Sequence, residues 1–196
     1  MEERQVTVDA VTHELAKPFM VIATQNPIEY EGTYPLPEAQ LDRFLMRVKM
    51  GYPDRNAGID ILETHGATEP VDNLSPVLTA ADVVHLSEAV TGIYVAPSLK
   101  GYIIDVVEAT RQERDLVLGV SPRGALALQR TARAFAASSG RDYVIPDDLK
   151  VLAGSVLEHR LILSPEAQLR GATAADVLEA VLGRVPVPSV RAGAGG

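Results

Sequence analysis

Hydrophobic and polar residues follow a different pattern in the first fifty residues than in the rest of the chain. Residues 5–9 alternate polar and apolar side chains, a short turn follows, and 11–15 continues the pattern, which predicts a β-hairpin. Residues 19–23 are continuously apolar, as is typical of a strand buried on both faces of a parallel sheet. A second strand is predicted over 45–50. The front of the chain is therefore expected to be part of an α/β domain.

A short helix is predicted between these two strands. The first strand ends at Asn26-Pro27, because proline cannot donate to a sheet. A polar loop over 28–35 leads to the helix, predicted over 36–44 and entered through Pro37 in its first turn.

From residue 54 onward the spacing of apolar residues is helical. Gly51-Tyr52-Pro53 marks the boundary, and Ser121-Pro122 is a helix start with a capping hydroxyl. Thr79 to Asp82 and Thr173 to Asp176 are capping boxes that open two further helices. The predicted helices span 54–65, 79–90, 98–114, 122–138, 146–159 and 174–183. This divides the chain into domains over 1–51 and 52–188, with a disordered Gly-rich tail over 189–196.

Composition narrows the classes of function. The 196 residues are 46% hydrophobic and carry a net charge of -8, which argues against nucleic acid as a partner. The sequence has no cysteine and no apolar run near the roughly 18 residues of a membrane helix. We expect a cytoplasmic protein without membrane insertion.

Asn26 is the first candidate for chemistry. It follows the apolar strand, at the edge where open α/β sheets place ligand-binding groups. An amide there can hold the water that attacks a phosphoryl group. The alternative is that Asn26 only shapes the turn before Pro27.

Arg43 is the second candidate. On the predicted short helix, Leu41, Phe44 and Leu45 can share a buried face that leaves Arg43 pointing outward, which suits recognition of a phosphate on another subunit. The alternative is a surface arginine paired with Asp42 or Glu38.

Arg123 is the third candidate. It lies in the first turn of the helix predicted over 122–138. A cation there opposes the helix dipole unless an anion binds nearby. A solvated surface arginine loses only a few tenths of a kcal/mol in this position, so that alternative stays open.

Two kinds of site are missing from the sequence pattern. The four histidines show no metal-ligand spacing, so no metal site is predicted. No Gly-x-x-x-x-Gly-Lys-Ser/Thr loop occurs, so the 196 residues cannot cradle a triphosphate in the P-loop manner.

Two long stretches of the sequence carry a resemblance to a known family. The first is the run from Met1-Glu2-Glu3-Arg4 through Asn26-Pro27-Ile28-Glu29-Tyr30 to Leu41-Asp42-Arg43-Phe44. The second contains Ala109-Thr110-Arg111, Gly119-Val120-Ser121-Pro122-Arg123-Gly124 and Ile145-Pro146-Asp147-Asp148-Leu149. The first stretch closely resembles the MoxR branch of the AAA+ ATPases, and the second is similar to the helical lid of that family.

The resemblance implies a fold and three site residues. The fold would be an α/β remnant of a AAA+ P-loop core, with two strands, a hairpin and a short helix, followed by an all-α helical lid. Asn26 would be sensor 1, and Arg43 the arginine finger that reaches the γ-phosphate of a neighbouring subunit. Arg123 would be sensor 2 in the lid.

The resemblance also implies cofactors and partners. Family members bind ATP and Mg²⁺ through Walker A and Walker B motifs that this sequence lacks, so the chain alone is expected to bind neither. Met1 would then be an internal methionine, unless the protein is genuinely shortened. The intact protein would be a homo-oligomeric ring, expected to be a hexamer, that remodels or activates protein partners, including proteins with von Willebrand factor A domains.

Two other functions compete with this reading. The chain could be a non-catalytic interaction module that docks onto full-length subunits. A DNA-translocating ring is disfavoured by the acidic charge balance and the lack of a basic stripe.

Overall fold

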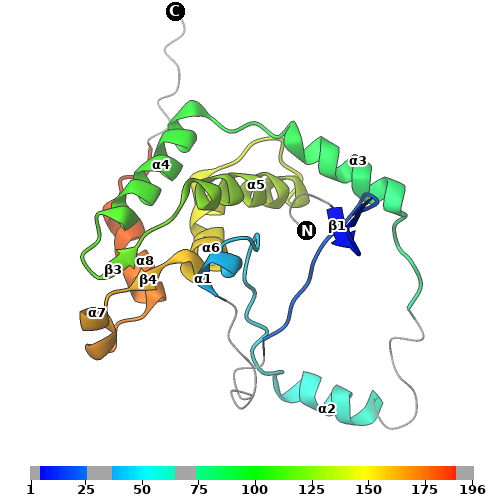
Figure 1. Ribbon diagram of the computed structural model, residues 1–196, viewed down its shortest axis with the longest axis horizontal. Helices are drawn as coiled ribbons and strands as arrows, with labels where there is room; N and C mark the ends of the chain where they lie inside the picture. The colour runs from blue at the N-terminus through cyan, green and yellow to red at the C-terminus, as the bar shows by residue number, and fades with distance from the viewer. Residues whose placement is uncertain (1–4, 26–36, 65–73, 189–196) are drawn as a thin grey trace, which may run out of the picture.

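Helices dominate the structure, a computed structural model that describes residues 5–25, 37–64 and 74–188 (Figure 1). Statements about the structure below refer to these residues. The elements in chain order are β1 (Gln5–Val8), β2 (Val11–Glu14), α1 (Glu38–Leu41), α2 (Arg55–Thr64), α3 (Ala80–Thr91), α4 (Pro97–Arg111), β3 (Leu116–Leu118), α5 (Pro122–Ser138), α6 (Pro146–Leu157), the 3-10 helix η2 (Glu158–Arg160), β4 (Ile162–Leu163), α7 (Pro165–Leu169) and α8 (Ala174–Arg184).

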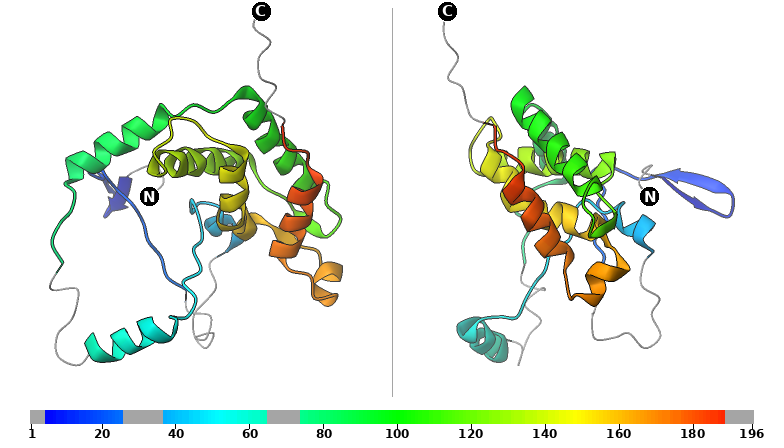
Figure 2. Two further views of the ribbon diagram at one scale, coloured as in Figure 1. Left: turned by 180° about the vertical axis from the view of Figure 1, so that it is seen from behind. Right: turned by 90° about the vertical axis from the view of Figure 1, so that its left-hand side faces the viewer.

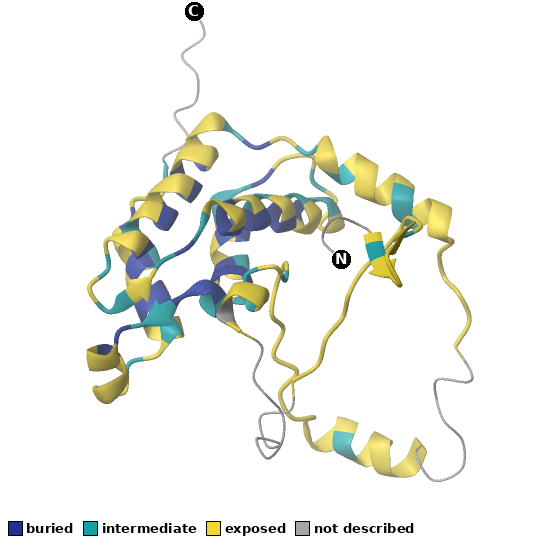
Figure 3. Ribbon diagram, viewed as in Figure 1, coloured by how far each residue is buried: buried dark blue, intermediate teal, exposed yellow. Residues whose placement is uncertain are grey.

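The hydrophobic core lies among α4, α5, α6 and α8. Figure 3 shows the buried residues concentrated on the faces that these helices turn toward one another. Burial of large apolar side chains is the main force that holds such helices together. The largest side chains that are fully buried there are Tyr102, Val106, Leu128, Leu149, Leu157 and Val181.

The predicted helices are confirmed to within a few residues, and the reasons lie in their first turns. Thr79 and Thr173 each form the predicted capping box, in which the threonine hydroxyl accepts from the amide three residues on and the aspartate accepts from the threonine amide. Proline lies in the first turn of α4, α5, α6 and α7, where a backbone N–H would have no acceptor within the helix.

The predicted hairpin is confirmed as well. β1 and β2 pair antiparallel, with Gln5 opposite Glu14 and Val8 opposite Val11. Asp9 and Ala10 form the turn with φ of 50° and 65°, the left-handed values that match the twist of a two-residue hairpin loop. The hairpin projects away from the helical body (Figure 2, right).

The two strands predicted over 19–23 and 45–50 are wrong for this structure. Neither segment has regular structure, and both lie on long connecting stretches (Figure 1). Met20 and Ile22, expected to be buried, are each 77% exposed. A buried strand needs hydrogen-bonded neighbours and covering helices, and within the described residues β1 and β2 pair only with each other.

The helical region contains a small sheet that the sequence pattern did not indicate. β3 and β4 pair antiparallel, with Leu116 opposite Leu163, and a parallel bridge joins Tyr94 to Tyr143. The two strands are three and two residues long, too short for a periodic pattern. They connect the end of α4 to the segment after η2.

Neither membrane spans nor metal clusters are found in the described part of the chain. None of its helices has the length and apolar character that crossing a membrane requires. Its His, Asp and Glu side chains form no group of three or more that could hold a metal ion.

Candidate functional site

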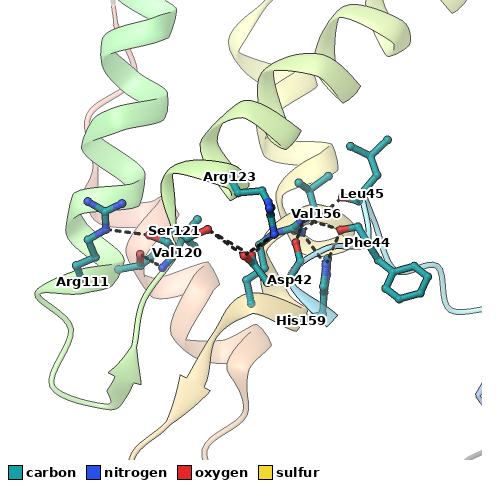
Figure 4. A network of polar contacts seen from close by, with 11 residues as sticks. Asp42, Phe44, Leu45, Arg111, Val120, Ser121, Arg123, Val156 and His159 are labelled. Carbon is teal, nitrogen blue, oxygen red and sulfur yellow. Dashed lines mark hydrogen bonds and ion pairs between the residues drawn. The ribbon is translucent and has the colours of Figure 1, made fainter. Parts of the chain in front are cut away.

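Asp42, directly after α1, is the centre of a polar network that joins the front of the chain to the helical body (Figure 4). Its carboxylate oxygens both lie 3.3 Å from the hydroxyl of Ser121. Nε of Arg160 lies 3.1 Å from Oδ1, and Nη1 of Arg123 lies 3.9 Å from Oδ2. One hydroxyl and two guanidiniums, from the residue before α5, from α5 itself and from η2, therefore surround one carboxylate from residues 37–46.

The loop before α5 is fixed in place by the end of α4. The amide of Val120 donates to Oγ1 of the buried Thr110 at 3.0 Å, and Nε of Arg111 donates to the carbonyl of Val120 at 2.8 Å. Gly119 lies so close that a Cβ there would be 2.7 Å from the amide nitrogen of Arg111. These contacts set the position of Ser121 and the first turn of α5.

Ser121 begins α5 as predicted, but its hydroxyl has a different role. The side chain makes no capping hydrogen bond to the helix and instead donates to Asp42. A charged acceptor forms a stronger hydrogen bond than a neutral one. The Ser121 hydroxyl therefore links α5 to the segment after α1 and does not cap the helix.

Arg123 lies in the first turn of α5 and is partly exposed. Its location calls for an anion near the helix N-terminus, and in this structure the carboxylate of Asp42 supplies one. The side chains are 43% and 27% exposed and the separation is long, so solvent screens the pair. The Arg123 guanidinium thus lies near the Asp42 carboxylate at the N-terminus of α5 and remains partly accessible to solvent.

Arg43 follows Asp42 and is exposed. Its amide donates to the carbonyl of Gln40 at 3.1 Å, which extends the turn of α1. The alternative pairing with Asp42 does not occur, because that carboxylate faces Ser121, Arg123 and Arg160. Within the described residues the Arg43 side chain has no ion pair, and the side chain of Glu38, its other suggested partner, is not described.

Asn26 lies outside the described residues, so its position relative to Arg43 and Arg123 stays a prediction. The structure brings together Arg123 and Asp42, the neighbour of Arg43.

Arg160 and His159 complete the network from η2. The Arg160 side chain is 2% exposed, and Nη1 lies 2.6 Å from Nε2 of His159. Because a guanidinium has only donors, this contact is a hydrogen bond only if His159 Nε2 is unprotonated, and Nε2 then cannot donate to the carbonyl of Phe44 3.4 Å away. Burial lowers the pKa of Arg160, while the nearby Asp42 carboxylate raises it.

The pKa of His159 is also shifted. Burial, the largest cause, lowers its pKa below the ordinary value, and the charge of Arg160 lowers it further. Smaller effects follow in both directions, since the Phe44 carbonyl and Asp42 raise the pKa and Arg47 lowers it. His159 is therefore neutral near pH 7, as its contact with Arg160 requires.

Sequence reasoning missed Asp42 and Arg160 as members of the site. Asp42 was considered only as a partner of its neighbour Arg43. Arg160 carried only a weak signal, since it stands directly before the apolar run 161–163, and an arginine is almost never fully buried without partners.

Chemically, the exposed guanidiniums of Arg43 and Arg123 suit phosphate recognition, because a planar guanidinium donates two parallel hydrogen bonds to a phosphate.

A shallow pocket elsewhere contains none of the predicted site residues. Its lining consists of Ala109, Gln112, Glu113, Arg114 and Arg184.

Two family models match separate parts of the chain. Residues 1–46 match the ATPase family associated with various cellular activities, and residues 108–181 match the AAA lid domain. The Asp42 network therefore joins the last residues of the first match to the start of α5 within the second.

Known proteins match nearly the whole chain. YeaC of Bacillus subtilis, an uncharacterised protein, is 48% identical over 97% of this chain and 60% of its own length. Chaperone MoxR1 of Mycobacterium tuberculosis is 39% identical over 98% of this chain and 53% of its own length. The crystal structure of a Cytophaga hutchinsonii protein assigned as an ATPase superimposes with a TM-score of 0.85 at 35% identity, covering 96% of this chain and 60% of that one.

The chain thus spans between about half and three-fifths of the length of these relatives. Its fold is a partial AAA+ core followed by a helical lid, with the small β3–β4 sheet inside the lid. By both the sequence and the structural matches, the chain belongs to the MoxR-type AAA+ ATPase family.

Proposed function

We propose that these residues work as the sensor and lid part of a MoxR-type ATPase, which hydrolyses ATP at subunit interfaces to remodel or activate protein partners. Support comes from the two family matches and from the relative named Chaperone MoxR1. The observation that carries the proposal is the Asp42 network, in which one carboxylate joins the residue before Arg43 to the first turn of α5.

Each candidate residue has a distinct role in this proposal. Arg43, exposed at the end of α1, would act as the arginine finger and reach the γ-phosphate held by a neighbouring subunit. Arg123 would act as sensor 2 on a phosphate held by its own subunit, and Asn26 as sensor 1, which orients the attacking water. ATP with Mg²⁺ supplies the phosphoryl group when bound, and the guanidiniums stabilise the charge that develops on it.

The contact of Arg123 with Asp42 suits a residue that changes partners. A partly exposed ion pair at 3.9 Å contributes at most about 1 kcal/mol. A phosphate with more charge and more acceptors competes well for the same guanidinium. Arg160 would keep the Asp42 carboxylate neutralised after Arg123 turns to the phosphate.

We infer the assembly, location and partners of the intact protein from its family. Subunits would assemble into a homo-oligomeric ring in the cytoplasm, a hexamer by expectation, and proteins with von Willebrand factor A domains are the expected partners. The reading frame upstream of the Met1 codon offers an inexpensive check. A phosphate loop and an Asp-Glu pair in frame there favour the enzyme, whereas a stop codon favours an interaction module.

The direct test is Arg43→Ala in the full-length ATPase that contains these residues. Loss of an arginine finger is expected to lower kcat by about 10³-fold or more, because the charge on the transferring phosphoryl group loses a partner. The dissociation constant for ATP should change little, since the finger belongs to the neighbouring subunit.

A matched control is Arg170→Ala. Arg170 is an exposed lid arginine paired with Asp115, and its removal should leave kcat unchanged. An Arg43→Ala enzyme with the kcat of the control would rule out the finger.

A further inference from the structure

Arg160 is the only arginine among the described residues whose side chain is almost completely buried, at 2% exposure. Burying a guanidinium is unfavourable unless its donors are satisfied. The hydrogen-bond partners of this guanidinium therefore indicate its role.

Most of those partners are backbone carbonyls from the front of the chain. Nη2 of Arg160 donates to the carbonyls of Asp42 at 3.3 Å and Phe44 at 2.5 Å. Nη1 donates to the carbonyl of Leu45 at 3.5 Å and also to the carbonyl of Val156 in α6. Residues 42–45 lie after α1, so their carbonyls belong to no helix or sheet and need other donors. The guanidinium supplies donors to these carbonyls from more than a hundred residues away.

The two carbonyls bound by Nη2 flank Arg43. The carbonyl of Asp42 belongs to the peptide before Arg43, and the carbonyl of Phe44 lies just after it. The backbone of Arg43 is thus held from both sides by one lid side chain, whereas its own side chain stays exposed.

Gly124 leaves the space that this arrangement needs. A Cβ at Gly124 would lie 3.0 Å from Cδ of Arg160 and 2.4 Å from Cγ1 of Val120. The Arg160 side chain consequently passes close to the first turn of α5, the turn that carries Arg123, on its way to residues 42–45.

A lid arginine with a purely structural role looks different. Arg141 forms two hydrogen bonds with Asp148, and both residues lie in the lid. Arg160 instead directs three of its donor contacts to residues 42–45. These contacts indicate that Arg160 connects the lid to the segment after α1.

We propose that Arg160 is a positioning residue that fixes the backbone on both sides of Arg43 to the lid, so that Arg43 moves with the first turn of α5. The proposal rests on the proposed role of Arg43 as the arginine finger. Lid rotation around a bound nucleotide in one subunit would then reposition the finger that this subunit offers to its neighbour.

The test uses Arg160→Lys, which keeps the charge beside Asp42 but cannot span the carbonyls of Asp42, Phe44 and Leu45 at once. The contacts of Arg160 with the carbonyls of Asp42, Phe44 and Leu45 are called the clamp below. In the 196-residue chain, residue-resolved amide hydrogen exchange reports on the clamp. The amides of Arg43 and Phe44, bonded to the carbonyls of Gln40 and Leu41, are expected to exchange at least ten times faster. Exchange in α4 and α5 should stay as it was.

In the full-length ATPase the same substitution is expected to lower kcat about 10- to 100-fold with an unchanged KM for ATP, because a small displacement of a catalytic group slows the reaction strongly. Arg170→Lys, a matched change on the lid surface, should alter neither the exchange nor the kcat. Arg160→Gln should reproduce the kcat defect if the fork geometry is what matters.

Three results would overturn the clamp. These are unchanged exchange at Arg43 and Phe44, faster exchange spread equally through α4 and α5, or a wild-type kcat in Arg160→Lys when Arg43→Ala has lost its activity. Failure of the proposed function is read separately, from Arg43→Ala. If that variant keeps its kcat while Arg160→Lys loosens only residues 43–44, the finger is wrong and the structural clamp stands.

Discussion

At the scale of single residues, Asp42 decides how the site is organised. The sequence indicated Arg43 because it points away from the apolar face of a short helix, and Arg123 because a cation at a helix N-terminus calls for an anion. It could not indicate that Asp42 meets Ser121, 79 residues further on. Contacts at such separation depend on how the elements pack, which local periodicity does not encode.

His159 makes the stability of this network depend on pH. Its pKa in the folded protein is lower than in the unfolded chain, where it is near 6.5. As the pH falls below about 6.5, the unfolded chain binds a proton that the folded protein excludes, so the free energy of unfolding decreases. Protonation also places a positive charge against Arg160.

We therefore expect the melting temperature of the 196-residue chain to fall between pH 7.5 and 5.5, and His159→Gln to reduce that fall. His85→Gln, at an exposed position on α3, is the matched control and should keep the wild-type dependence. Equal pH dependence in all three proteins would contradict this assignment.

At the scale of elements, the sequence predicted helices far better than strands. Capping boxes at Thr79 and Thr173 and prolines in first turns are local signals, and the helices begin where they indicate. The apolar runs at 19–23 and 45–50 also carried a signal, but a strand exists only if a neighbour pairs with it. The described residues contain no such neighbour, so both runs lie outside any sheet.

The lid helix α6 offers an element-scale prediction. Asp148, 2% exposed, bonds with Arg141 through both carboxylate oxygens and accepts from the amide of Ile145 at the start of α6. Burial alone would raise the pKa of Asp148, and these bonds lower it instead. The folded lid thus contains a buried carboxylate whose charge depends on its partner.

Arg141→Ala is expected to reduce the free energy of unfolding by about 3 kcal/mol, because it leaves this charge buried and uncompensated. Arg170→Ala breaks a more exposed pair with Asp115 and should cost about 1 kcal/mol or less. Urea denaturation of both variants measures the difference. Equal losses would show that burial of Asp148 does not set the energy of its pair.

At the scale of the whole molecule, the lid contains the core and the front of the chain adds little to it. α2 has no buried residue in the described structure, and the hairpin stands apart from the helices. The segment after α1 is the exception, since Arg47 donates to the carbonyl of Ser155 and Lys49 pairs with Glu158 in addition to the Asp42 network. The family could be assigned from the sequence because long motifs carry the assignment. The packing of residues 42–49 against the lid could not be predicted, because it depends on contacts between residues far apart in the chain.

Arg43 is proposed to act on a nucleotide held by a neighbouring subunit. The most direct measurement mixes two inactive forms of the full-length ATPase, one with Arg43→Ala and one disabled in its phosphate loop. Neighbouring subunits of the two kinds form interfaces with an intact loop on one side and an intact Arg43 on the other. We predict that ATP hydrolysis reappears on mixing and is greatest near equal proportions; no recovery at any ratio would contradict a role across the interface.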